Sequence, residues 1–442
     1  MRAWRTLAII AALSLTGAMG LGAMDFDFGG FVENSSTPSV ALDSANPVFA
    51  MDQKDRLALW AEFHFGSDLS LTAQGSYAFS IPLPYLFDVD ALRLDWKILP
   101  SLRASLGRFV FSDFTGHVLN HKLDGALISM DFPFMVLSAG AGFSGLLLKP
   151  SSLVLMSRSD TTDQSSSGVF FAAPRLVEKL DVLFPNLLPR QDLTISVILQ
   201  QDLRSSGSLI QAGEQQQFVT GLSGGSLTSE YFGVGFSGAI ISALYYDAFF
   251  YFSLGSTLSY VADSASGTGS SYQYAAIQAF LGGIGLRYYN EGLLSSRAEL
   301  RAIISSGDAD NSTFLEGNTA GASTLFVPIS QETLGLAFQP QLGNLLIINA
   351  SYSLKPVTQL QLMAKVQSFL RPTTGAISAL GIDSASSAFY LGTEVDGIAN
   401  FRPFSDLGLA FSLGCFLPNG SAFTGQAALP VLAGRLEVSF SF

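Results

Sequence analysis

Apolar and polar side chains alternate along many short segments of the chain. In residues 69–79 every odd-numbered position is apolar or Gly, and most even-numbered positions carry Ser, Thr or Gln. Residues 193–200 and 360–367 repeat the pattern. Because successive side chains of a β-strand point to opposite faces, each segment has one dry face and one wet face. The pattern predicts strands along the whole chain.

Charged residues also take part in this alternation in mid-strand, as Arg297, Glu299 and Arg301 do. A soluble β-sandwich alternates too, but charges in mid-strand suit a watery lumen better. Aromatic residues gather in residues 245–252, as in the interfacial girdles of membrane barrels. We therefore expect an all-β fold, a transmembrane antiparallel up-and-down β-barrel. It should have about 16–18 strands, with 18 preferred for this length.

Residues 231–260 are nearly all apolar apart from Asp247, which makes them the best candidate for a membrane helix. Gly233, Gly235 and Gly238 would each weaken a helix, and the density of Tyr and Phe favours strands. We therefore expect two strands in this region.

Residues 174–189 depart from the alternation, because their apolar side chains recur at roughly helical spacing. These side chains are Leu176, Val177, Leu180, Leu183 and Phe184. The spacing predicts a short helix, either at the periplasmic rim of the barrel or folded into the lumen as a constriction.

The connections fall into two classes. Residues 99–101 and 132–134 each centre on a Pro and predict tight turns, which we place on the periplasmic side. Four stretches rich in Ser, Thr, Gly and Asp are typical of the longer extracellular loops of such barrels. They are residues 159–168, 262–271, 305–323 and 371–387.

Composition agrees with contact between the chain and lipid. Hydrophobic residues make up 48% and charged residues only 13% of the 442 residues. Few apolar runs approach the ~20 residues that a spanning helix needs, so the lipid contact must come from strands. The net charge of −12 and the lack of a Lys/Arg run argue against nucleic-acid binding.

The N-terminus predicts a secretory signal. Arg2 and Arg5 precede an apolar stretch from Leu7 to Leu15, and small residues follow up to Ala23. We expect residues 1–23 to be the signal peptide, cleaved after Ala23, and residues 24–442 to be a single barrel domain in the bacterial outer membrane.

Charged residues at polar positions of the expected strands predict a pore lining of mixed sign. Opposed fixed charges can bias the passage of charged solutes, although such pairs can also simply satisfy one another across neighbouring strands. The candidates are Glu62, His64, Arg93, Asp95, Lys97, Arg103, Arg297, Glu299, Arg301, Lys365, Glu394, Asp396, Arg435 and Glu437.

Arg108 breaks the parity of its segment, where Leu102, Ala104 and Leu106 form the apolar face. Without an irregularity its charge would face lipid. We therefore expect a β-bulge at Gly107 that turns Arg108 toward the pore.

No catalytic motif stands out, and we expect no enzyme, no cofactor and no metal site. The His residues are His64, His117 and His121, and none lies in a nucleophile motif. His117 and His121 have a metal-like spacing only on a helix, whereas their segment has the pattern of a loop after a strand. The lone Cys415 has no partner for an internal disulfide.

The C-terminal residues 435–442 form the clearest single strand. Leu436, Val438, Phe440 and Phe442 alternate with Arg435, Glu437 and two Ser residues, so the former should face lipid. The terminal Phe resembles the signal by which such barrels are recognised for insertion. We assign that signal to Phe440 and Phe442, with the barrel-assembly machinery as partner.

Two stretches carry a resemblance to a known family. Residues 106–113 (LGRFVFSD) with 120–127 (NHKLDGAL), and residues 391–403 (LGTEVDGIANFRP) with 407–418, are similar to porin-like proteins of the alginate-export group. The resemblance implies an 18-stranded barrel that passes a sugar-like or other small hydrophilic solute. It also places Arg108, Asp124, Glu394 and Asp396 near the pore.

The leading hypothesis is an outer-membrane porin for passive diffusion of small hydrophilic solutes. One alternative is a transporter of hydrophobic compounds like the long-chain fatty-acid channels, suggested by the many Phe residues. Another is a surface adhesin or structural barrel whose Ser/Thr/Gly loops bind. The expected partners are outer-membrane lipid, the assembly machinery and the solute; a homo-oligomer stays open.

Overall fold

The computed structural model describes residues 24–42, 47–81, 83–204, 215–217, 226–263, 269–309, 315, 321–379, 381–383 and 386–442. The predicted signal peptide lies outside these residues, so its cleavage stays a prediction. No helix in this described part is long and apolar enough to cross a membrane.

Strands dominate the described chain. They are β1 (Met24–Ala41), β2 (Val48–Phe65), β3 (Leu69–Ser80), β4 (Leu86–Leu99), β5 (Leu102–Ser112), β6 (Asn120–Asp131), β7 (Val136–Phe143), β8 (Arg175–Leu188), β9 (Gln191–Asp202), β10 (Gln215–Gln217), β11 (Leu227–Ile241), β12 (Leu244–Asp263), β13 (Gly269–Asn290), β14 (Ser296–Ser305), β15 (Leu346–Val357), β16 (Leu360–Leu370), β17 (Tyr390–Phe401), β18 (Leu407–Pro418) and β19 (Val431–Ser441). Short helices are η1 (Lys149–Ser151), α2 (Arg158–Ser165) and η3 (Gly425–Ala428).

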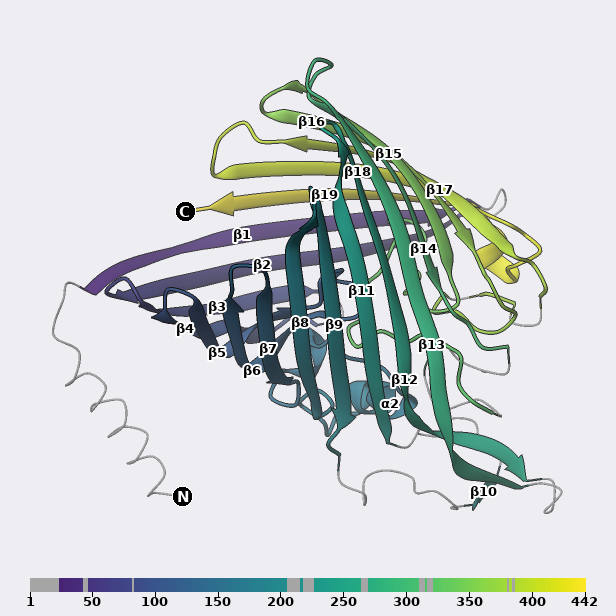
Figure 1. Ribbon diagram of the computed structural model, residues 1–442. Coiled ribbons are helices and arrows are strands. Elements are labelled where there is room, and N and C mark those ends of the chain that lie inside the picture. Colours follow the sequence, from purple (N-terminus) through teal and green to yellow (C-terminus); the bar gives the residue numbers. More distant parts are fainter. Residues whose placement is uncertain are drawn as a thin grey trace.

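All of these strands except β10 form the wall of a closed antiparallel barrel, shown in Figure 1. Each wall strand pairs with the wall strands before and after it, and β11 follows β9 because β10 is a short side strand on β13. Pairing of β1 with β19, from Phe31–Ser441 to Ala41–Val431, closes the ring. The predicted up-and-down barrel is confirmed, with the preferred number of 18 strands.

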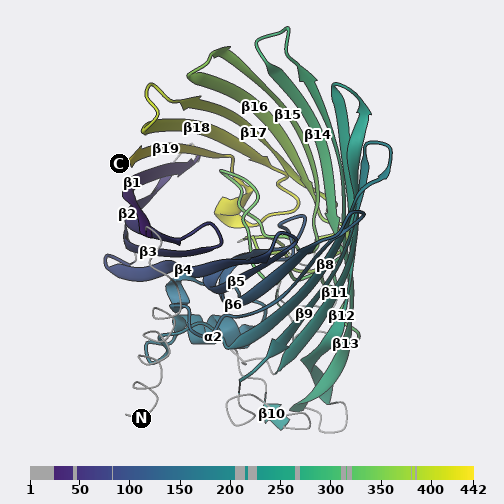
Figure 2. The same cartoon turned by 60° about the vertical axis from the view of Figure 1, so that its left-hand side comes forward.

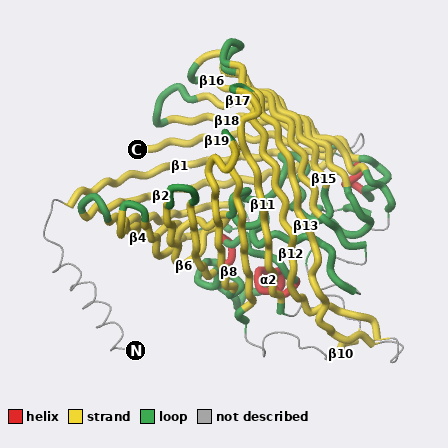
Figure 3. The backbone as a smooth tube through the Cα atoms, in the orientation of Figure 1, coloured by secondary structure: helices red, strands yellow, loops and turns green. Residues whose placement is uncertain are grey.

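The two ends of the barrel differ in the length of their connections (Figure 3). At one end, which we call the short-turn end, the connections are as brief as residues 100–101, 189–190 and 358–359. The first residues of β1 and the last residues of β19 lie at this end as well. The other end, here the long-loop end, carries connections such as residues 144–174 and 306–345. The tight turns expected at 99–101 and 132–134 both lie at the short-turn end.

The strand pairing defines which side chains point into the barrel and which point outward, because directly paired residues of an antiparallel ladder share a face. The outer face carries mostly Phe, Leu, Ile and Val, for example Phe28, Leu59 and Phe250. The inner face carries most of the charged and small polar residues. Such an apolar outer band is what the hydrocarbon layer of a membrane requires.

Loops from the long-loop end fold into the barrel and form its buried core. In Figure 2, green loop segments lie within the ring of strands. Ile329 donates its backbone N–H to the Val118 carbonyl at 2.9 Å, although the two loops are far apart in sequence. From the wall, Tyr231 donates its hydroxyl to the Val327 carbonyl at 2.6 Å. Phe111 and Phe326 are fully buried in this core.

The strands expected in residues 231–260 are confirmed as β11 and β12. The helix predicted at residues 174–189 is wrong, because these residues form β8. Both faces of β8 carry apolar side chains: Val177 points inward onto the loop core, whereas Leu176 and Leu180 point to lipid. Apolar residues on both faces of a strand can imitate helical spacing.

Candidate functional site

Most of the predicted pore residues share the inner face of the wall. The ladders put fourteen of them there: Glu62, His64, Arg93, Asp95, Lys97, Arg103, Arg297, Glu299, Arg301, Lys365, Glu394, Asp396, Arg435 and Glu437. Their surroundings differ greatly, because some contact open space and others are covered by the loop core.

Arg108 and Asp124 lie on the other face of the sheet. They are directly paired, and Arg108 also pairs with the outward-facing Leu92. The expected bulge at Gly107 is wrong: the β5–β6 ladder passes through it without a register shift. The irregularity lies on β4, where Asp90 is an extra residue opposite β3.

Charged side chains bridge the place where β4 and β5 separate. The ladder between these strands ends at Leu92 and Arg108. Beyond it, Lys122 on β6 binds Asp88 and Asp90 on β4 at 2.6 and 3.1 Å. Asp90 in turn accepts from Arg56 on β2 at 2.8 Å, and Arg108 binds Asp124 at 2.8 Å. These pairs tie β2, β4, β5 and β6 together. The sequence had pointed to Arg108 and Asp124 but not to their ion pair or to those of Lys122 and Asp90.

A second charge cluster lies on the inner face of β12–β14. Asp247 accepts from both Arg287 and Arg301, each at 3.1 Å, and Glu299 binds Arg301 at 3.3 Å and also Arg297. The cluster lines a cavity of about 330 Å³. Most of its charge is neutralised by these pairs.

Glu394 and Asp396 also face inward, but the connection between β14 and β15 covers them. Glu394 is fully buried and accepts the backbone N–H groups of Leu336 and Phe338, both at 2.6 Å. Lys365 lies 3.9 Å from Asp396. This acidic pair therefore contacts a loop and not open space.

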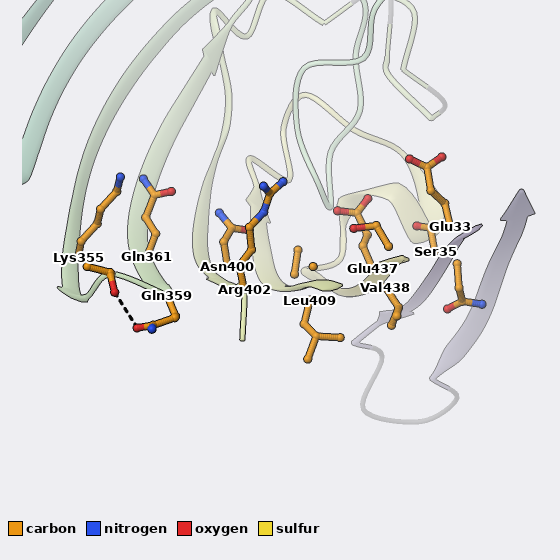
Figure 4. A pocket seen from close by; sticks show the side chains of 15 residues that line it. Glu33, Ser35, Lys355, Gln359, Gln361, Asn400, Arg402, Leu409, Glu437 and Val438 are labelled. Atoms are coloured by element: carbon orange, nitrogen blue, oxygen red, sulfur yellow. Dashed lines mark hydrogen bonds between the residues drawn. The ribbon is translucent and has the colours of Figure 1, made fainter. Parts of the chain in front are cut away.

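Two open cavities lie beside β19 and β1. The first has a volume of about 610 Å³ and lies toward the short-turn end, beside Lys355, Gln361 and Arg402 (Figure 4). The second has a volume of about 710 Å³ and lies toward the long-loop end, between the wall and residues 333–339. Because both are lined by Glu33, Ser35 and Glu437, the cavities adjoin.

The charges beside these two cavities are less neutralised than those of the other clusters. Within the described chain, the side chains of Lys355, Arg402, Arg435 and Glu437 have no ion pair or hydrogen bond. Arg56 and Glu33 form a pair of 3.3 Å that is open to solvent. Sequence reasoning found Arg435 and Glu437. It missed Lys355, which lies beside the β15–β16 turn.

The histidines do not gather into a metal site. Among the residues that the structure describes, no three His, Cys, Asp or Glu side chains lie close enough to hold a metal ion. His117 lies in the β5–β6 loop, with its ring 5.6 Å from that of Phe249, and burial lowers its pKa. His121 lies on β6, where its Nε2 accepts the Leu153 N–H at 3.3 Å.

The two residues assigned to the insertion signal lie on the outer face at the seam of the barrel. The rings of Phe440 and Phe442 are 6.3 Å apart and nearly parallel. Phe442 also exchanges two backbone hydrogen bonds of 3.0 Å with Gly30 on β1. The terminal residue thus helps to close the ring, and its role as an insertion signal stays a prediction.

Comparison with known proteins shows the fold of this chain. No family model and no curated protein matches the sequence. Among solved structures it is similar to OpdQ of Pseudomonas aeruginosa, with a TM-score of 0.56 and 10% identity over 95% of this chain and 98% of that one. OpdL of the same organism gives 0.55 and 12% over 94% and 99%, and OccK11 gives 0.54 and 11% over 95% and 96%. The resemblance to the alginate-export group is not confirmed. The chain has the closed 18-stranded barrel fold of outer-membrane porins.

Proposed function

We propose that the chain is a passive outer-membrane channel for small hydrophilic solutes. The observation that carries the proposal is the pair of adjoining cavities along β19 and β1, which together extend from the short-turn end toward the long-loop end. Their shared lining of Glu33, Ser35 and Glu437 is polar. A hydrophilic solute that gives up hydration water in the passage can form hydrogen bonds to these groups instead.

The cavity lining favours hydrophilic over hydrophobic cargo. Apolar side chains are abundant inside the barrel, but they pack against one another, as Phe338 does on Phe416 at 4.3 Å between ring centres. The open space is lined instead by charged and amide groups, such as Lys355, Gln361 and Asn400. A fatty-acid-type transporter needs an apolar path, which these cavities do not provide.

The orientation of the barrel in the membrane and its partners follow from a channel function. We infer that the short-turn end faces the periplasm and the long-loop end the outside, as in other outer-membrane barrels. The apolar outer face contacts lipid, the assembly machinery inserts the chain, and no chemistry is performed on the solute. A homo-oligomer is compatible with this arrangement.

Single-channel recording in a planar bilayer tests the proposal. The purified, folded full chain should give stepwise conductance in KCl, and liposomes that contain it should swell in a small neutral sugar. A folded protein that inserts into the bilayer and never conducts overturns the proposal. Swelling that stops for larger sugars would give the size limit of the passage.

A further inference from the structure

We propose that Glu394 is a positioning residue that holds residues 333–339 against the wall and thereby sets the width of the solute passage. This inference rests on the proposed channel function. Residues 333–339 belong to the connection between β14 and β15 and lie inside the barrel. Glu394 lies on β17, on the inner face of the wall.

Both oxygens of the Glu394 carboxylate bind this segment. Oε1 accepts the N–H of Leu336 and Oε2 accepts the N–H of Phe338, each at 2.6 Å. Hydrogen bonds from a backbone N–H to an ionised carboxylate are shorter and stronger than neutral ones. A carboxylate can accept at both oxygens, whereas the amide of Gln offers one acceptor and places N–H donors at the other position.

Aromatic packing fixes the same segment beside Glu394. The Phe338 ring stacks on Phe416 of β18 with 4.3 Å between centres and 7° between planes. It also meets the rings of Phe369 and Phe423 edge-on, at 5.0 and 5.8 Å. Such ring pairs add about 0.5–1.5 kcal/mol each beyond the area they bury. The segment is therefore held by one polar and one apolar anchor.

The segment is folded too tightly around the Glu394 carboxylate to hold a side chain at Gly335. A Cβ at this position would lie 2.0 Å from the Phe338 carbonyl and 3.0 Å from each carboxylate oxygen of Glu394. The Leu334 N–H donates to the Pro340 carbonyl at 3.1 Å, which closes the segment into a compact turn. In this compact turn both N–H groups point at the one carboxylate.

The opposite side of the segment bounds the passage. Thr333, Ala337 and Gln339 line the second cavity, across which lie Arg435 and Glu437 of β19. Because the cavity is the space between the segment and this wall, its width depends on where the segment is held. Loss of the Glu394 contacts should let the segment move away from β17 into this cavity and narrow the mean opening.

Single-channel recording of Glu394→Gln in the full chain tests the inference. We expect conductance in KCl to fall by about half or more, and the size limit for neutral polyethylene glycols to move to smaller polymers. The matched control is Glu178→Gln, the same substitution on the outward face of β8, which should leave conductance unchanged. Folding of each variant is checked by the mobility shift on heating that barrels show in detergent gels.

Phe338→Leu is a second variant that tests the same inference. Phe338→Leu loosens the apolar anchor without altering the wall, and it carries the same expectation if E394Q does not fold. A folded E394Q variant whose conductance and size limit equal those of a conducting wild type overturns the role of Glu394. If E394Q does not fold, a folded F338L variant that equals the wild type overturns it instead. A folded wild type that never conducts overturns instead the channel function on which the inference rests.

Discussion

Arg175 donates from Nη2 to both carboxylate oxygens of Asp160, at 2.9 and 2.8 Å, and neither side chain is exposed to solvent. Asp160 lies in α2, and Arg175 is the first residue of β8. Arg204, just after β9, donates to Asp160 at 2.9 Å and to Asp202 at 2.6 Å. This network joins the loop helix to the ends of two wall strands.

The first prediction concerns Asp160. Burial alone would raise the pKa of this carboxyl, but Arg175 and Arg204 together with two backbone N–H groups lower it below its ordinary value. Asp160→Asn should therefore leave the buried guanidinium of Arg175 with Asp202, 3.5 Å away, as its remaining counter-charge, at a cost of no more than about 3–5 kcal/mol. Urea unfolding in lipid vesicles and trypsin cleavage within residues 158–174 would measure the loss.

The matched control is Asp95→Asn. Asp95 also pairs with an arginine, Arg93, but both side chains are partly open to the lumen. Exposed pairs contribute about 0–1 kcal/mol, so this variant should unfold nearly as the wild type does. Equal losses of stability in the two variants would show that the buried network stabilises the fold no more than an exposed ion pair does.

The second prediction is a pH dependence at His117. Burial is the main cause of its lowered pKa, to which Arg301 adds, whereas Asp113 opposes the shift. Its folded pKa lies below the unfolded one, so the folded chain binds fewer protons and loses stability as the pH falls below about 6.5. His117→Phe should reduce the dependence of the urea midpoint on pH between pH 7.5 and 5, the range around the ordinary pKa of histidine.

A second histidine provides the comparison for this prediction. His64 lies on the inner face of β2, away from the loop core, so His64→Gln controls for the loss of an imidazole outside that core. A wild-type midpoint that does not change over this range, or an H117F variant whose midpoint depends on pH as strongly as that of the wild type, would contradict the contribution of His117.

The strands were predictable because their signal is local. The alternation of residues 69–79 reports which face of β3 meets lipid, and the wall confirms it. The loop core was not predictable, because its contacts join residues such as Val118 and Ile329 that are far apart in the chain. Glu394 shows the consequence: parity places it inward, but only the fold reveals the loop that covers it.

The third prediction concerns the charge of the passage. Arg435 lines the second cavity and has no counter-ion among the described residues, so Arg435→Glu changes the fixed charge there by two units. Under a KCl gradient, the reversal potential should move toward cation selectivity. Arg158→Glu, the same change on α2 and away from both cavities, is the control. Equal shifts in both variants would argue against a passage along β19.

The fourth prediction tests the closure of the barrel at Gly30. A Cβ at this position would lie 2.6 Å from the Phe442 ring, 2.8 Å from Leu59 and 2.9 Å from the Ala58 carbonyl. Gly30→Val should therefore force β1 away from β19 and cost about 1–3 kcal/mol or more by overpacking. We expect slower folding into detergent micelles and a smaller fraction of the compact form on unheated gels.

The control for this variant is Gly397→Val. Gly397 also lies on the outward face of a wall strand, β17, but a Cβ there would meet nothing within 4 Å. Both variants make the same chemical change on the lipid side, so a difference between them reports the crowding at the seam. If G30V closes as fast as G397V does, the terminal strand has more freedom than its contacts with Gly30 allow, and Phe442 does not limit closure.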